Sequence, residues 1–391
     1  MSTTQNNLAW ILAASNVAET CALDVARSAG LRVHVLREAY TGPAGDSDSH
    51  RTVLNDFEDD AALGNAISIA ARHSGKPSCV IAMDEYAILA AGKVRRILGL
   101  PGHGPADLVA LRDKRVMHDR VQAAGILTTR RLSREELKYW DFTHPVIAKP
   151  ADRAGSEKVR RLTSPTDHVD DDEVIEVWQE GVPSHVDGIS VGGEMVFAQA
   201  STYGSGSCFD YTQGRPLTSW TLAPDDPQVA PLIDASAHVV HALRLPDGAF
   251  HCEFFVVGLT AVFLEIGARP GGGFIVEAVE AATGINLRKE HVRAGLGLTV
   301  TSTAGRSCAG GFWLLPPPGE NAAAIRVVRA TEPPALRSEV LNRTYPAVGD
   351  PLGHSDDYRD ALASFTLAAN DAAVIADDLA TLTEQVQVIC R

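Results

Sequence analysis

The sequence predicts a mixed α/β and α+β fold, in which an N-terminal open parallel α/β domain precedes a larger α+β region. Apolar runs of strand length alternate with helical segments over residues 1–100. Farther along, a turn at Gly258 separates two strand-like runs, which indicates an antiparallel hairpin. A chain of 391 residues is also long enough for about two or three packed domains or subdomains.

The first domain repeats one unit of strand and helix. Residues 8–14 form an apolar run of strand length, and the helical spacing after it ends at Gly30. Residues 31–36, Leu-Arg-Val-His-Val-Leu, have the pattern of a second strand. The alternation continues with a helix at 61–72, a strand at 78–83 and a helix at 86–98. Alternating units of this kind predict a parallel sheet with helices on both of its faces.

The second region has the pattern of an α+β structure. The spacing predicts one helix over 106–124, and glycine turns divide residues 174–203 into strands. The apolar runs 248–257 and 260–266 are joined by a short link, which predicts the hairpin. Other expected elements are a strand at 145–150 and helices at 227–244 and 274–283.

Charge and cysteine spacing restrict the class of protein. With 35 Lys and Arg against 49 Asp and Glu, the formal net charge is −14, which disfavours nucleic acid as a partner but allows a nucleotide in one cleft. The six cysteines lie far apart without a metal-binding or disulfide spacing, which predicts reduced thiols in a cytoplasmic protein. The apolar run at 8–14 is too short for a membrane helix, so neither a membrane span nor an export signal is expected.

The most informative residues are two glutamates in the hairpin. Glu253 and Glu265 stand in strands rich in apolar residues, and side-chain alternation lets His251 share a face with Glu253. A carboxylate in such surroundings is costly without a cation. A hard ion such as Mg²⁺, bound together with substrate phosphates, would satisfy both carboxylates. Solvent-facing or ion-paired glutamates at a strand edge are the alternative interpretation.

Three cationic residues are candidates for anion binding. Arg269 precedes a glycine run and carries a planar fork of donors that suits a carboxylate or a phosphate. Lys149 ends an apolar strand and is followed by a small loop at Gly155 and Ser156, which favours phosphate contact. Lys114 is a weaker candidate of the same kind. Taken singly, each has a plainer interpretation as a solvated surface side chain.

Together, the order of these motifs resembles the ATP-grasp superfamily, with the greatest similarity to the biotin carboxylase-like ligases, including the L-amino acid ligases that make dipeptides. The resemblance covers residues 1–315. It rests on Leu-Gly-Leu-Pro-Gly at 98–102, Arg-Asp-Lys at 112–114, Ala-Gly-Ile at 124–126, Val-Ile-Ala-Lys-Pro at 146–150, Gly-Ser at 155–156, His-x-Glu at 251–253 and Glu-Ile-Gly-Ala-Arg-Pro-Gly-Gly at 265–272.

The resemblance implies ATP and Mg²⁺ as cofactors. By it, Lys114 and Lys149 would contact the ATP phosphates and the loop at 155–156 would close over them. Glu253 and Glu265 would hold Mg²⁺. Arg269 would be the catalytic residue, because it would stabilise an acyl phosphate and the tetrahedral species that follows.

The adenine and ribose contacts implied by the resemblance are less complete. Backbone groups of the hinge that begins at Glu176 would bind the base, with Trp178 beside it. Pro183 stands where the family often has a ribose-binding glutamate, so Glu180 or His185 is expected to serve instead. Two further departures are Gly267, where many relatives have a metal-binding asparagine, and Lys158, at a position that is often glycine.

The family pattern also divides the chain. The expected parts are an N-terminal domain at 1–100, a linker helix region at 101–128, a lid subdomain at 129–190, a metal and substrate subdomain at 191–310 and a β-rich C-terminal extension at 311–391 packed on the core. Three residues, His185, Asp187 and Arg288, are expected near the substrate pocket, with ordinary surface loops as the alternative.

The sequence therefore predicts an ATP-dependent carboxylate–amine ligase that forms an amide through an acyl phosphate and releases ADP and phosphate. Its partners would be a small carboxylate, such as an amino acid, and an amine. A homodimer is compatible with the sequence, which leaves the oligomeric state open. The alternatives are a carboxylase-like enzyme that activates bicarbonate and a nucleotide-binding module with a decayed site.

Overall fold

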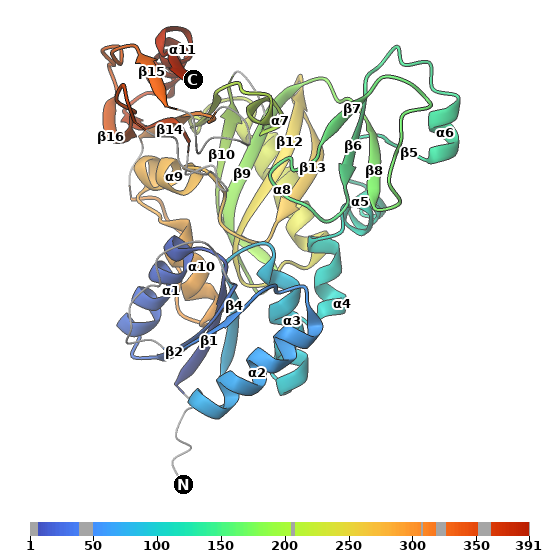
Figure 1. Ribbon diagram of the computed structural model, residues 1–391, viewed down its shortest axis with the longest axis vertical. Helices are drawn as coiled ribbons and strands as arrows, with labels where there is room; N and C mark the ends of the chain where they lie inside the picture. The colour runs from blue at the N-terminus through green and yellow to red at the C-terminus, as the bar shows by residue number, and fades with distance from the viewer. Residues whose placement is uncertain are drawn as a thin grey trace.

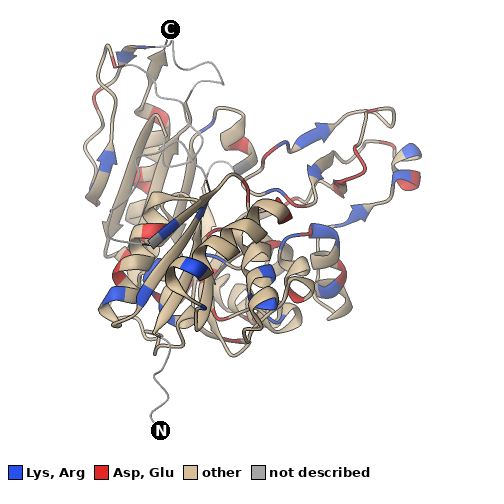
Figure 2. Cartoon of the chain, turned by 60° about the horizontal axis from the view of Figure 1, so that its bottom comes forward, with Lys and Arg blue, Asp and Glu red and all other residues tan. Residues whose placement is uncertain are grey.

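The structure is a computed structural model that describes residues 7–38, 50–204, 208–305, 308–317, 326–350 and 361–390. Three parts are visible in Figure 1: an N-terminal domain at the bottom, a large sheet above it, and a small sheet that projects to the upper right. In Figure 2 acidic and basic segments are interspersed along the ribbon. Within the described residues, no helix has the combination of length and apolar character needed to cross a membrane.

The N-terminal domain has a four-stranded sheet in the order β3-β2-β1-β4, and its strand pairs are parallel. Its strands are β1 Leu8–Ala13, β2 Arg32–Glu38, β3 His50–Leu54 and β4 Cys79–Ala82. Trp10 and Leu12 pack toward α2 (Asp60–Ser74) and α3 (Ala87–Leu98). Alternate residues of β1 pack toward α1 (Asn16–Ser28) and α10 (Leu287–Gly295) on the other face. The prediction of a parallel sheet with helices on both faces is confirmed.

The segment after this domain differs from the prediction. The single helix expected over 106–124 is wrong, because the chain forms α4 (Pro105–Leu108), a short 3-10 turn and then α5 (Lys114–Ala123). The Asp113 side chain accepts a hydrogen bond of 2.8 Å from the backbone N–H of Arg115, and it caps a new helix there. This restart makes Lys114 the first residue of α5.

The small projecting sheet, which we call the lid, has four strands in the order β5-β8-β6-β7. Its elements are β5 Arg131–Leu132, α6 Arg134–Lys138, β6 Val146–Pro150, β7 Arg160–Leu162 and β8 Glu173–Val177. It has a small apolar core of its own, which includes Val146, Ala148 and Ile175. The lid therefore has an apolar core that is separate from that of the large sheet.

The large sheet has eight strands in the order β13-β12-β9-β10-β11-β14-β17-β16. They are β9 Val182–Val191, β10 Glu194–Tyr203, β11 Leu217–Thr221, β12 Gly248–Val257, β13 Thr260–Gly267, β14 Ala309–Leu315, β16 Glu339–Thr344 and β17 Ala363–Ala369. The predicted hairpin is confirmed as β12 and β13. The lid boundary expected at 190 falls near the end of β9, which belongs to this sheet and not to the lid.

Helices cover the large sheet and connect it to its surroundings. These are α7 Cys208–Thr212, α8 Val229–Leu243, α9 Ile275–Thr283 and α11 Ala372–Gln385, with a two-stranded sheet of β15 Val327–Ala330 and β18 Val388–Cys390. The C-terminal extension joins the core by more than packing, because β14 pairs with β11 in register and continues the sheet.

Candidate active site

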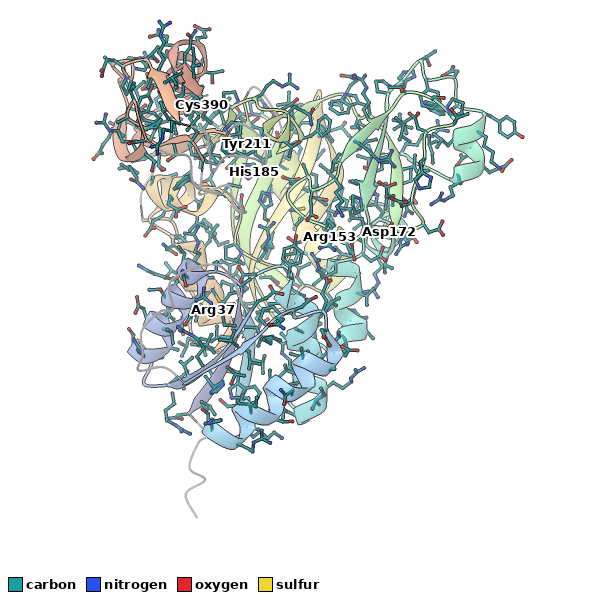
Figure 3. The ribbon with its side chains drawn as sticks, viewed as in Figure 1. Arg37, Arg153, Asp172, His185, Tyr211 and Cys390 are labelled. Atoms are coloured by element: carbon teal, nitrogen blue, oxygen red, sulfur yellow. The ribbon has the colours of Figure 1, made fainter. Side chains whose placement is uncertain are left out.

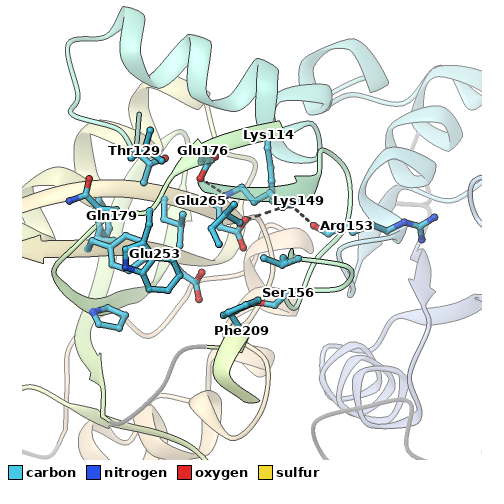
Figure 4. A pocket seen from close by; sticks show the side chains of 18 of the residues that line it. Lys114, Thr129, Lys149, Arg153, Ser156, Glu176, Gln179, Phe209, Glu253 and Glu265 are labelled. Carbon is cyan, nitrogen blue, oxygen red and sulfur yellow. Dashed lines mark hydrogen bonds and ion pairs between the residues drawn. The ribbon is translucent and has the colours of Figure 1, made fainter. Parts of the chain in front are cut away.

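A cleft lies between the lid and the end of the large sheet that carries β12 and β13 (Figure 4). Lid residues on one side are Ile147, Lys149, Val177 and Trp178, and core residues on the other are Tyr203, Glu253, Phe254, Leu264 and Glu265. Lys114 of α5 and the loop residue Ser156 complete the lining. Charged groups therefore meet at the part of the cleft near α5, and apolar groups line its walls.

Glu253 and Glu265 are direct cross-strand partners in the register of β12 and β13. Both line the cleft, and their side chains are 15% and 29% exposed. The Tyr203 hydroxyl donates to Glu253 Oε1 at 2.9 Å, and His251 Nε2 lies 3.2 Å from the same oxygen. Burial raises the pKa of Glu253, but the hydrogen bond and charge of His251 outweigh it and lower this pKa to about 2. Glu253 is therefore a carboxylate at neutral pH.

This pair fits a hard divalent cation. Direct cross-strand neighbours present their side chains on the same face of a sheet. Carboxylate oxygens are the ligands that Mg²⁺ prefers, usually one or two from the protein together with substrate phosphates. Glu253 and Glu265 supply that donor set at a position where both carboxylates reach the cleft.

Lys149 and Glu176 form a buried ion pair within the lid, with 3.0 Å between Nζ and Oε2. Both residues line the cleft, and they are 6% and 4% exposed. Burial lowers the pKa of Lys149, but the carboxylates of Glu176 and Glu265 outweigh it and raise this pKa. Lys149 therefore stays cationic and is aimed at the space between the lid and the two core glutamates.

Lys114 reaches the cleft from the first turn of α5. Its Nζ donates to the backbone carbonyl of Arg153, and it lies 3.5 Å from Glu265 Oε2. Figure 4 shows Lys114 and Lys149 on either side of Glu265, with the side chain of Arg153 extending away from them. The predicted lysines and glutamates are thus brought together in one place.

The hinge between the lid and the large sheet forms the apolar wall. Trp178 and Gln179 line the cleft, and the Trp178 ring meets the ring of Phe209 edge-on at 6.4 Å between centroids. The side chain of Glu176 forms an ion pair with Lys149, so Glu176 contributes more to this region than its backbone groups. Pro183 lies in the lining, whereas the exposed Glu180 does not. The structure therefore does not bring Glu180 to the cleft.

The loop that joins β6 to β7 carries strained backbone beside the cleft. Gly155, Ser156 and Lys158 have φ angles of +65°, +59° and +55°. The left-handed region is natural for glycine and uncommon for serine or lysine. Ser156 lines the cleft, so the strained backbone of this loop lies beside the cleft.

Arg269 forms a contact with the N-terminal domain that the sequence analysis missed. Its Nε donates to Glu85 Oε2 at 2.7 Å, and Arg112 lies 3.3 Å from the other oxygen of Glu85. Burial raises the pKa of Glu85, but Arg269 and Arg112 outweigh it and lower this pKa. Glu85 follows β4 at the carboxyl edge of a parallel sheet, where ligands bind in open α/β folds, and that position could have singled it out.

Three predicted substrate residues do not line the cleft. His185 and Asp187 are 1% and 0% exposed inside the large sheet, and Figure 3 shows His185 among its strands. Arg288 pairs with Glu277 at 2.7 Å and lies in a separate groove between α1 and α10. The structure therefore does not place these three residues at this cleft.

Several solved structures have a fold similar to that of this chain. An L-amino acid ligase from Bacillus licheniformis matches with a TM-score of 0.74 at 17% identity, over 99% of this chain and 99% of that chain. A phosphoribosylglycinamide synthetase from Anaerococcus prevotii matches with a TM-score of 0.69 at 13% identity, over 98% and 99% of the two chains. A biotin carboxylase from Campylobacter jejuni matches with a TM-score of 0.65 at 15% identity, over 98% and 92%.

No protein-family model matches the chain, and no curated protein matches it by sequence. At these identities the likeness is one of fold, and it extends over nearly the whole of each chain. The three solved structures are ATP-grasp proteins. The chain therefore has the ATP-grasp fold.

Proposed function

We propose that this protein is an ATP-dependent carboxylate–amine ligase that joins an amino acid, or a similar carboxylate, to an amine. The observation that carries the proposal is the meeting of Glu253, Glu265, Lys114 and Lys149 at one cleft between the lid and the core. Two carboxylates for a cation beside two ammonium groups suit the triphosphate of ATP. The fold shared with an L-amino acid ligase supports the same assignment.

The reaction would proceed in two balanced steps. A carboxylate oxygen of the substrate attacks the γ-phosphorus of ATP, the bond to the bridging β–γ oxygen breaks, and ADP leaves. The amine nitrogen then attacks the carbonyl carbon of the acyl phosphate. The bond to the phosphate oxygen breaks, phosphate leaves, and the amine loses a proton to solvent or to a base.

The residues that line the cleft, together with Arg269 outside its lining, match the charge that these steps develop. Lys114 and Lys149 would hold the phosphates, because each is a buried cation whose present partners are a carboxylate or a carbonyl. Mg²⁺ held by Glu253 and Glu265 would supply neutralisation of phosphate charge. Arg269 would bind the carboxylate and the acyl phosphate through its guanidinium, which Glu85 holds in place. The loop with Ser156 would exclude water from the acyl phosphate.

A second candidate function is activation of bicarbonate, which the likeness to a biotin carboxylase favours. In that reaction bicarbonate takes the place of the carboxylate substrate. Both candidates need the same cleft. Bicarbonate would give carboxyphosphate and ADP, and an acceptor nitrogen would then bond to its carbon as phosphate leaves, so the candidates differ in the attacking molecule and in the final product.

A phosphate-release screen distinguishes them. The protein is incubated with ATP and Mg²⁺ and with amino acids singly and in pairs, and a parallel arm contains bicarbonate. Release that requires a pair of amino acids, with a new amide detected by mass spectrometry, supports the ligase. Release that follows bicarbonate alone supports the second candidate, and ATP binding without release in any mixture contradicts both.

A further inference from the structure

Behind the cleft, five side chains form a continuous hydrogen-bonded chain that ends on Glu253. Asp187 on β9 and His251 on β12 are cross-strand partners, and His251 Nδ1 lies 2.9 Å from Asp187 Oδ1. The other oxygen of Asp187 lies 2.5 Å from His185 Nδ1. His185 Nε2 in turn lies 2.7 Å from the Ser219 hydroxyl. Each oxygen of the fully buried Asp187 carboxylate is therefore engaged by a separate imidazole.

His251 connects this carboxylate to Glu253. Its two ring nitrogens face carboxylate oxygens, Asp187 Oδ1 at 2.9 Å and Glu253 Oε1 at 3.2 Å. Because ionised carboxylates only accept hydrogen bonds, the ring donates at both nitrogens. Tyr203 donates to the same Glu253 oxygen. In the described part of the chain, the hydrogen bonds of Glu253 all fall on Oε1, which leaves Oε2 for the cleft.

Asp187 also contacts the segment that follows Arg269. A Cβ atom on Gly271 would lie 2.6 Å from Asp187 Oδ1, so the backbone at Gly271 packs directly against the carboxylate. Asp187 therefore contacts both His251, which lies within hydrogen-bond distance of Glu253, and the loop that begins at Arg269. The structure places His185 and Asp187 behind the cleft and not in its lining.

We infer that Asp187 is a positioning residue that fixes the Glu253 carboxylate for a divalent cation through His251. The inference rests on the proposed function, because it assigns Glu253 to the cation. Hydrogen bonds that orient a ligating carboxylate restrict it to the orientation that binds the ion, and losing such a partner typically lowers metal affinity about 10–100-fold.

A metal ion held by His185, Asp187 and His251 themselves is the competing interpretation. Their donor atoms all lie within 4.8 Å of one another and are buried. However, the Nδ1 atoms of both histidines already lie at hydrogen-bond distance from the Asp187 oxygens. Hydrogen bonding satisfies these groups without an ion.

The test measures binding of Mn²⁺ by electron paramagnetic resonance, in the presence of a non-hydrolysable ATP analogue. Asp187→Asn should weaken Mn²⁺ binding at least about 10-fold, while the affinity for the analogue without metal stays within about twofold. Tyr203→Phe, which removes one hydroxyl, should weaken it less and keeps the test available if Asp187→Asn does not fold. Asp378→Asn is the matched control, because Asp378 is a buried aspartate that accepts from the backbone N–H of Ser338 in the C-terminal part.

The outcomes separate this inference from the proposed function. Equal Mn²⁺ binding by the unaltered protein, Asp187→Asn and Tyr203→Phe would overturn the role of Asp187 and leave the cation site intact. No Mn²⁺ binding by the unaltered protein would overturn both. Elemental analysis tests the competing interpretation. If the unaltered protein contains a stoichiometric transition metal and Asp187→Asn lacks it, then Asp187 binds a metal ion and does not position Glu253 by hydrogen bonds.

Discussion

Glu253 and Glu265 face each other across β12 and β13, 12 positions apart in sequence and opposite each other in the sheet. The hairpin brings the two carboxylates together in two stages: the turn at Gly258 pairs Phe254 with Phe263, and a register shift between Glu253 and Phe254 then pairs Glu253 with Glu265 instead of Leu264. Had the register shifted by one residue, one glutamate would point to the other face of the sheet. The chemistry proposed for the cleft depends on this register.

Glu265→Gln should lower Mg²⁺-dependent ADP formation about 100-fold or more, because it removes one anionic ligand while keeping the side-chain size. The side chain is 29% exposed and its nearest cation is Lys114 at 3.5 Å, so the melting temperature should change little. Coupled assay of ADP and thermal denaturation check the two statements. ADP formation near that of the unaltered protein would remove Glu265 from the cation site.

Arg269→Lys should lower kcat about 100-fold with little change in the KM for ATP. The substitution keeps a positive charge but cannot make the two contacts that Arg269 makes, Nε to Glu85 at 2.7 Å and NH1 to the Pro270 carbonyl at 3.0 Å. Steady-state kinetics with varied ATP provide the measurement. A rise in the KM for ATP at constant kcat would indicate that Arg269 binds the nucleotide in its ground state.

Glu176→Gln should lower the free energy of unfolding at pH 7 by about 3–5 kcal/mol, since it leaves Lys149 buried without its anionic partner. Burial raises the pKa of Glu176, but Lys149 and His118 outweigh it and lower this pKa below the ordinary value of 4.5. The stabilisation from the ionised group is therefore complete above that ordinary value and is lost as the pH falls through the folded-state pKa. Urea denaturation from pH 7 downward should show the difference between the two proteins shrinking in acid, and a constant difference would contradict the pairing.

Local pattern was sufficient for much of the fold. The parallel domain followed from alternating apolar and helical segments, and the hairpin followed from two apolar runs around Gly258. The break before α5 was missed, since apolar spacing alone does not show that the Asp113 side chain caps a new helix. The hydrogen bond that Asp113 accepts from the backbone N–H of Arg115 begins a new helix there, where apolar spacing alone favours one continuous helix.

Local sequence patterns predict only part of the candidate site, because some of its contacts join residues far apart in the chain. Arg269 and Glu85 are 184 positions apart, and no local pattern connects residues at such a separation. His185 and Asp187 were expected near the substrate pocket, with ordinary surface loops as the alternative. In the central strand β9 both faces are covered, so Ser184, His185 and Asp187 are all buried and alternation carries no information about exposure.

Gly271→Ala tests the packing between Asp187 and the loop after Arg269. The new Cβ would lie 2.6 Å from Asp187 Oδ1 and 2.7 Å from Ile275 Cγ2, so the loop must move, and we expect kcat to fall about 10–100-fold with a destabilisation of about 1–3 kcal/mol. Gly272→Ala is the matched control, because a Cβ there meets nothing within 4 Å. Kinetics and denaturation of both variants provide the comparison. Equal effects at the two positions would mean that the segment tolerates or resists side chains irrespective of Asp187.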